Sequence, residues 1–116
     1  MERADALRAL YRAFNAREID AVLAALSPDV RWPNGWEGGW IDGREGVREY
    51  WLRQWADIDP VVEPERIDRR DDGAWAVRVR QVVRSLDGTL LSDGRVTHVY
   101  RFAPDGLVTR MDIEEG

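Results

Sequence analysis

Residues 96–113 have the sequence VTHVYRFAPDGLVTRMDI, which is typical of two antiparallel strands joined by a tight turn. The segments 96–102 and 107–113 are rich in β-branched and aromatic residues, which favour strands. Pro104-Asp105-Gly106 fits a three-residue hairpin loop, a type I turn with glycine in the left-handed position. Ala103 is therefore predicted to pair with Leu107.

This turn sets a predicted register for the two strands. The expected pairs are His98 with Asp112, Tyr100 with Arg110 and Phe102 with Val108. Cross-strand partners share one face of a sheet and lie about 5 Å apart at Cβ. A different pairing in the loop would place Met111 opposite His98 instead, and that alternative stays open.

Two further strands are predicted before this hairpin, because residues 61–69 and 75–84 alternate apolar and polar side chains. The turn at Asp71-Asp72-Gly73 pairs Trp75 with Arg69 and Val77 with Ile67. If Gly94 forms a bulge, three residues of one strand share a face with three of the next. These are Trp75, Val77 and Val79 on one strand and Tyr100, His98 and Val96 on the other.

The N-terminal half follows helical spacing instead, with one brief strand. Helices are predicted over residues 4–15, 19–26 and 44–58, and the strand over 30–32. Ser27-Pro28 would end the second helix and Pro60 the third. Asp42-Gly43-Arg44-Glu45 resembles a capping box with Asp42 as N-cap. This order of elements indicates an α+β fold, a curved sheet with helices packed on one face.

Residues 34–40 have the sequence NGWEGGW, and the glycines, with Pro33 before them, exclude regular structure. Three of the six tryptophans, Trp32, Trp36 and Trp40, lie in or beside this loop. Tryptophan packs a core or lines a recognition surface, so we expect the loop to cover the open end of the core, a ligand, or both. If the loop shields a pocket mouth, replacing Trp36 with alanine should weaken ligand binding more than it lowers the melting temperature.

The chain has 116 residues, one domain's worth, and a net charge of −5 from 17 basic and 22 acidic side chains. This balance argues against binding to nucleic acid and to anionic membranes. Cysteine is absent, which excludes disulfides and thiolate chemistry, and the single histidine excludes a zinc site made of several histidines. No apolar run suits a signal peptide or a membrane span, so we expect one cytoplasmic domain over residues 1–116, without a metal.

The predicted face of the last hairpin carries groups suited to acid/base chemistry. A histidine beside a carboxylate is a general acid/base pair in outline, because the carboxylate orients the ring and favours its protonated form. His98 and Asp112 are therefore the candidate catalytic residues. The alternatives are that His98 is a satisfied core residue, that Arg110 and Asp112 form a surface ion pair, and that Gln81 is an edge residue rather than a hydrogen-bonding group of a pocket.

Four segments resemble the SnoaL-like branch of the nuclear transport factor 2 superfamily. They are residues 26–32 (LSPDVRW), 43–47 (GREGV), 98–102 (HVYRF) and 105–108 (DGLV), in order along nearly the whole chain. The resemblance implies a cone-shaped, strongly curved antiparallel sheet with three N-terminal helices on its concave side, a cystatin-like α+β barrel around a hydrophobic pocket. It also implies a homodimer through the outer sheet face, where Val82, Val99 and Arg101 would otherwise be exposed.

The family's functional residues carry over only in part. Polyketide cyclases of this type place a histidine and an aspartate on the last two strands, which by resemblance are His98 and Asp112. The catalytic aspartate of ketosteroid isomerases corresponds to Trp32-Pro33, so that base is missing, and their oxyanion-binding aspartate corresponds to His98. The Asp-Arg-Asp arrangement of limonene-type epoxide hydrolases is not reproduced, because only Arg110 and Asp112 match.

Two functions are consistent with the pattern and the resemblance. The first is a cofactor-independent acid/base enzyme, cyclase-, isomerase- or dehydratase-like, acting on a small apolar carbonyl compound. Asp112 or its pair with His98 would take the proton, and His98 or Arg110 would stabilise the oxyanion. The second is a non-catalytic module that binds a hydrophobic ligand or dimerises. The predicted substrate-binding residues are Trp32, Trp36, Trp40, Trp51, Gln81, Tyr100 and Arg110.

Overall fold

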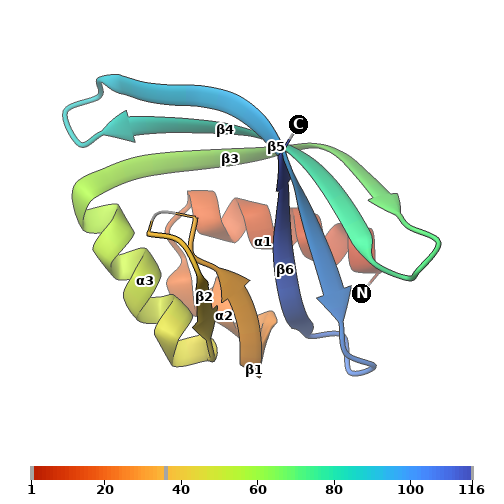
Figure 1. Ribbon diagram of the computed structural model, residues 1–116. Helices are drawn as coiled ribbons and strands as arrows, with labels where there is room; N and C mark the ends of the chain where they lie inside the picture. The colour runs from red at the N-terminus through yellow and green to blue at the C-terminus, as the bar shows by residue number, and fades with distance from the viewer. Residues whose placement is uncertain (1, 36, 116) are drawn as a thin grey trace.

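The computed structural model describes residues 2–35 and 37–115. In chain order its elements are α1 (Arg3–Asn15), α2 (Ile19–Ala24), β1 (Leu26–Pro33), β2 (Trp40–Asp42), α3 (Arg44–Asp57), β3 (Ile58–Arg69), β4 (Trp75–Ser85), β5 (Leu90–Phe102) and β6 (Val108–Glu115). The strands form one sheet in the order β2-β1-β6-β5-β4-β3, in which β1 and β6 are parallel and the other neighbours antiparallel. Figure 1 shows β3, β4 and β5 arching over α1 and α3.

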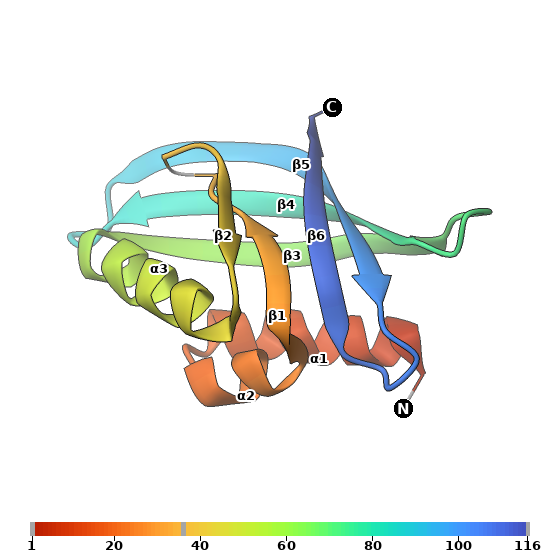
Figure 2. The same ribbon diagram turned by 60° about the horizontal axis from the view of Figure 1, so that its bottom comes forward.

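The sheet curves around the helices and stays open, with β2 and β3 as its two edges (Figure 2). α1 packs against β3, and α3 packs against both β1 and β3. The predicted α+β fold, with three helices on the concave side of a curved sheet, is therefore confirmed. None of the described helices combines the length and the apolar character that crossing a bilayer requires.

Asn15, the last residue of α1, ties this helix to the edge strand β3. Its Nδ2 donates to the carbonyl oxygen of Val62 at 2.8 Å, and its Oδ1 accepts from the N–H of Val62 at 2.9 Å. An edge strand leaves backbone N–H and C=O groups without a neighbouring strand to bond to. The side-chain amide of Asn15 hydrogen-bonds to these two groups of Val62 instead. Because Leu7, Leu10 and Tyr11 on the same helix are buried, α1 forms one wall of the space under the sheet.

The predicted ends of two helices are wrong. α2 stops at Ala24, and Leu26 already belongs to β1, where it pairs with Val108 of β6. The N-cap of α3 is Gly43 rather than Asp42, and no side chain caps the helix. The φ of Gly43 is 89°, in the left-handed region that glycine adopts without strain, so the chain turns from β2 into α3 at this residue.

Two strands extend further than the alternating pattern predicts. α3 ends at Asp57 and β3 begins at Ile58, so Pro60 lies inside a strand instead of ending a helix. β3 is an edge strand, where the missing N–H of a proline is tolerated. β5 begins at Leu90, well before the predicted start at Val96, and a short strand, β2, follows the glycine-rich loop.

The structure confirms the predicted pairing of β4 with both of its neighbours. Trp75 pairs with Arg69 and Val77 with Ile67 on β3, while Trp75, Val77 and Val79 pair with Tyr100, His98 and Val96 on β5. The bulge considered as a condition at Gly94 is absent from this described part of the sheet, since Gly94 pairs regularly with Gln81. The irregularity lies instead between Val83 and Arg84.

The predicted register of the last hairpin is right for the pairs Ala103–Leu107 and Phe102–Val108 and wrong beyond them. Phe102 pairs with Val108 as expected, but the next pair is Arg101 with Arg110, so Thr109 is an extra residue on β6. The Oγ1 of Thr109 donates to the carbonyl oxygen of Arg101 at 3.2 Å. This hydrogen bond gives the carbonyl group a donor at the bulge, where the regular pairing of the two strands is interrupted. The bulge shifts the later pairs by one residue.

This shift reverses the faces of β6, because neighbouring residues of a strand point to opposite sides. Tyr100 pairs with Met111, His98 with Ile113 and Val99 with Asp112. The predicted pairs of His98 with Asp112 and of Tyr100 with Arg110 do not form. Arg110 and Asp112 lie on the outer face of the sheet, and apolar side chains take the predicted place of Asp112 beside His98.

The outer face of the sheet is covered by pairs of arginines with carboxylates. These pairs are Arg80–Asp93, Arg95–Glu65, Arg70–Glu114, Arg101–Asp72 and Arg110–Asp112. Val99, expected to be exposed there, is only 5% exposed. Because charged side chains cover it, this face of the single chain is polar rather than apolar, and its exposed ion pairs contribute at most about 1 kcal/mol each to stability.

Candidate functional site

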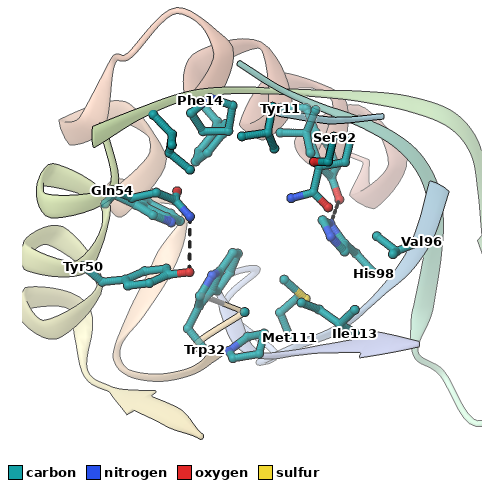
Figure 3. Close-up of a pocket in the computed structure, with 18 of the residues that line it drawn as sticks. Tyr11, Phe14, Trp32, Tyr50, Gln54, Ser92, Val96, His98, Met111 and Ile113 are labelled. Atoms are coloured by element: carbon teal, nitrogen blue, oxygen red, sulfur yellow. Dashed lines mark hydrogen bonds between the residues drawn. The ribbon is translucent and has the colours of Figure 1, made fainter. Parts of the chain in front are cut away.

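A cavity of about 490 Å³ lies between the concave face of the sheet and the helices α1 and α3. Figure 3 shows side chains of both helices and of the strands pointing into it from all sides. The helices contribute Leu10, Tyr11, Phe14, Tyr50, Trp51 and Gln54, and the strands contribute Trp32, Ile58, Val62, Gln81, Val83, Ser92, Val96, His98, Tyr100, Met111 and Ile113. Cavities of this size are typical of small-molecule sites.

One side of the cavity is a cluster of aromatic rings from four elements. The ring of Trp51 on α3 lies edge-on to Phe14 of α1 and to Trp32 of β1, each with its centroid 5.4 Å away. Trp32 in turn lies edge-on to Tyr100 of β5 at 6.2 Å. Edge-to-face pairs of large rings hold one another in place, so the wall is apolar and rigid.

Three polar side chains that also line the cavity form a hydrogen-bonded chain, which shares Tyr100 with the aromatic cluster. The Oη of Tyr100 donates to the Oη of Tyr11 at 2.8 Å, and the Oη of Tyr11 lies 2.8 Å from the Nδ1 of His98. All three residues are buried, with at most 7% of any of them exposed. β5 supplies Tyr100 and His98 from one face, and α1 lays Tyr11 across both.

Burial keeps each member of this chain uncharged at neutral pH. Desolvation lowers the pKa of His98 from 6.5 to about 4, because burial removes the water that would stabilise the positive charge of the protonated ring. Desolvation likewise raises the pKa of Tyr11 well above its usual value, with Tyr100 adding to the shift, and burial raises the pKa of Tyr100. The site therefore offers neutral hydrogen-bonding groups rather than a charged catalytic pair.

Few other polar groups reach the cavity. The Nε2 of Gln54 donates to the Oη of Tyr50 at 3.3 Å on α3, while Gln81 and Ser92 line the wall on β4 and β5. Glu115 lines the cavity from the end of β6 and is exposed. Across residues 2–35 and 37–115, no three His, Asp or Glu side chains gather as a metal site would require.

Five residues expected in the site do line the cavity: Trp32, Trp51, Gln81, His98 and Tyr100. Asp112 does not, because it lies on the outer face and accepts hydrogen bonds from Nε and Nη2 of Arg110, at 2.9 and 3.0 Å. The expectation that Asp112 and His98 point into one cavity is therefore wrong. Arg110 and Asp112 form the surface ion pair that was the alternative.

Trp40 also lies outside the cavity. The guanidinium groups of Arg31 and Arg110 both lie over its ring, each with Cζ 4.7 Å from the ring centroid. This double cation–π contact keeps the indole on the outer face of the sheet, 40% exposed, instead of in a pocket wall. Trp36 lies outside the described residues.

Within the hydrogen-bonded chain of Tyr100, Tyr11 and His98, the residue that sequence reasoning missed is Tyr11. Its position with Leu7, Leu10 and Phe14 on the apolar face of α1 was predicted, but no site role was assigned to it. A phenol on a buried helix face needs a hydrogen-bond partner, which is the available signal. The sequence does not say which residue provides that partner.

The family model described as a SnoaL-like domain matches residues 7–111. No curated protein sequence matches the chain. A solved NTF2-like protein of unknown function from Burkholderia pseudomallei is 26% identical, with a TM-score of 0.84 over 100% of this chain and 92% of that one. TerC, crystallised with polyporic acid, is 25% identical, with a TM-score of 0.83 over 98% and 91%.

A third structure shows the fold alone. RV0760c from Mycobacterium tuberculosis, in complex with estradiol-17β-hemisuccinate, is 23% identical, with a TM-score of 0.80 over 93% of this chain and 88% of that one.

Proposed function

This chain belongs to the SnoaL-like family, and we propose that its cavity binds a small, largely apolar ring compound. The observation that carries the proposal is the combination of a rigid aromatic wall with a neutral, buried polar chain in one cavity of about 490 Å³. Ring compounds stack well on aromatic side chains, and a few polar groups orient them. TerC and RV0760c, with the same fold, were each crystallised with a ring compound.

A large side chain placed inside the cavity is expected to weaken this binding, and the same side chain on the outer face of the sheet is not. Val83 lines the cavity, whereas its neighbour Val82 pairs with Asp93 on the outer face. We expect Val83→Trp to weaken binding of 9-fluorenone, measured by quenching of tryptophan fluorescence, by at least about tenfold, which is about 1.4 kcal/mol. Val82→Trp is the matched control. Equal binding by wild type and both variants would place the ligand elsewhere and contradict the proposal.

The second candidate is a cofactor-independent acid/base enzyme, and the buried neutral His98 favours it. A neutral imidazole in a dry site can donate a hydrogen bond to the oxygen of a developing enolate, which lowers the barrier to proton removal from the adjacent carbon. The proton needs a base, and among the described residues that line the cavity Glu115 is the one carboxylate.

Exchange of the α-protons of 2-tetralone for deuterium, followed by NMR in heavy water, tests for this activity. An enzyme of this kind should accelerate the exchange, and Glu115→Gln and His98→Asn should each lower the acceleration. Asp112→Asn is the control, because Asp112 lies on the outer face and should not affect the rate. No acceleration by the wild type would leave binding as the function and contradict the enzyme.

A homodimer through the outer face and a cytoplasmic location stay predictions. The face named for the dimer carries paired charges, and charge–charge contacts weaken as salt is raised. A dimer formed there should therefore sediment as a dimer at micromolar concentration in low salt and dissociate as salt increases. Sedimentation as a monomer in low salt would contradict it.

A further inference from the structure

The chemistry that His98 offers to a ligand depends on which ring nitrogen carries its proton. A neutral imidazole has one N–H donor and one nitrogen acceptor, and the partner of one nitrogen determines the role of the other. In this structure the partner is known for one nitrogen only, since Nδ1 lies 2.8 Å from the Oη of Tyr11. The protons of the two tyrosines therefore decide the tautomer.

The donor direction along the three hydrogen-bonded side chains starts from Tyr100. Its side chain is 1% exposed, and within the described part of the chain its hydroxyl has a single hydrogen-bond partner, the Oη of Tyr11. A buried donor without a partner costs free energy, so the proton of Tyr100 points to Tyr11. Tyr11 then has its own proton to place, and its other partner is Nδ1 of His98. Nδ1 is therefore the acceptor.

We propose that Tyr11, whose oxygen accepts from Tyr100, holds His98 as the tautomer with its proton on Nε2, so that the cavity selects ring compounds with an acceptor oxygen, such as a ketone or quinone carbonyl. This selectivity rests on the proposed binding function. Tyr11 is the positioning residue in it, because it acts on the ligand through His98.

The opposite tautomer would leave a buried hydroxyl without an acceptor. With the proton on Nδ1, His98 would donate to Tyr11, whose oxygen would accept from both His98 and Tyr100. The proton of Tyr11 would then have no acceptor, in a side chain that is 2% exposed. If the hydroxyl proton of Tyr11 pointed to the oxygen of Tyr100, the hydroxyl proton of Tyr100 would be left without an acceptor instead.

The Nε2 of His98 is available to a ligand. It has no hydrogen-bond partner among the described residues, but it is not sealed in the protein. The buried side-chain polar atoms without a partner, over those same residues, are Nε of Arg44 and Nε1 of Trp55. Since His98 lines the cavity, as Figure 3 shows, its Nε2–H meets the ligand space. A carbonyl oxygen there gains a donor, whereas a ligand N–H meets another N–H.

Nitrogen-15 NMR of the ligand-free protein at pH 7 tests the tautomer itself. His98 is the single histidine, so the couplings from its ring C–H protons to the two nitrogens need no assignment by mutation. We expect the proton on Nε2 in the wild type and in Tyr100→Phe, where Tyr11 still donates to Nδ1. In Tyr11→Phe nothing fixes Nδ1, and we expect both tautomers. A proton on Nδ1 in the wild type would overturn the proposal.

Three flat tricyclic compounds of nearly equal shape test the selectivity. 9-Fluorenone offers an acceptor, carbazole offers a donor, and fluorene offers neither. In the wild type and in Tyr100→Phe, 9-fluorenone should bind about two- to tenfold more tightly than fluorene, and carbazole no more tightly than fluorene. In Tyr11→Phe the preference for 9-fluorenone over fluorene should weaken, because nothing then fixes the proton of His98.

The outcomes separate the selectivity from the binding function on which it rests. Carbazole binding more tightly than fluorene to the wild type would overturn the selectivity alone. Failure of all three compounds to bind would overturn the proposed binding function and the selectivity with it. The NMR result on the free protein decides the tautomer in either case.

Discussion

Replacing Trp51 with alanine is expected to lower the free energy of unfolding by about 3–5 kcal/mol. Trp51 is 3% exposed, and its ring contacts Phe14 and Trp32 at 5.4 Å and Trp55 at 6.1 Å between centroids. The substitution removes buried apolar surface and leaves a void that the neighbouring rings of Phe14, Trp32 and Trp55 cannot move to fill. Since small domains are stable by about 5–15 kcal/mol, this variant should unfold at a much lower urea concentration.

Leu52 provides the matched control on the same helix. Its side chain is 51% exposed, so Leu52→Ala should change the free energy of unfolding by no more than about 0.5 kcal/mol. Trp51→Phe keeps a ring in the cluster and should fall between the two. A loss below about 1 kcal/mol for Trp51→Ala would mean that the neighbouring rings collapse into the space, and that the aromatic wall is not rigid.

Most of the strand pairing that is predicted correctly from the sequence follows from the turn residues. Gly73 and Gly106 have φ values of 88° and 92°, the left-handed conformation that both predicted turns require. The pairs next to these turns, Trp75 with Arg69 and Phe102 with Val108, are as expected. Local chemistry suffices here because a tight turn determines which residues face each other beside it.

The bulge at Thr109 explains why the predicted catalytic pair fails. Threonine favours regular strands, so nothing in its local sequence indicates an extra residue. One extra residue moves all later side chains of the strand to the other face. Asp112 is thereby removed from His98, although the turn that leads to it was predicted correctly.

The cavity wall was predictable where one element determines the face of a residue, as for Trp51 on α3 and Tyr100 on β5. The hydrogen bond between Tyr11 and His98 was not, because it joins residues 87 positions apart. It depends on how α1 docks against the sheet, and Asn15 holds that docking through the backbone of Val62. Spacing along the chain carries no information about such a contact.

Acidification from pH 7 to pH 4 is expected to cost the folded protein about 3 kcal/mol through His98 alone. The folded state holds the pKa of His98 at about 4, against an ordinary value of 6.5 in the unfolded chain. Between these values the unfolded state binds a proton that the folded state does not. The stability that neutral His98 contributes is therefore complete above pH 6.5 and is lost as the pH falls toward 4, at about 1.4 kcal/mol per pH unit.

His98→Asn isolates this contribution. Carboxylates paired with arginine, such as Asp93 and Glu65, have pKa values lowered by the hydrogen bonds from their arginines. Acid removes the stability that these pairs contribute equally in the wild type and in His98→Asn. The difference between the two urea-unfolding free energies should thus be constant above pH 7 and shrink by about 3 kcal/mol on reaching pH 4. Parallel curves from pH 7 to pH 4 would show that His98 protonates in place. Its ring would then be open to water, and the neutral hydrogen-bonded chain of Tyr100, Tyr11 and His98 could not be as the structure has it.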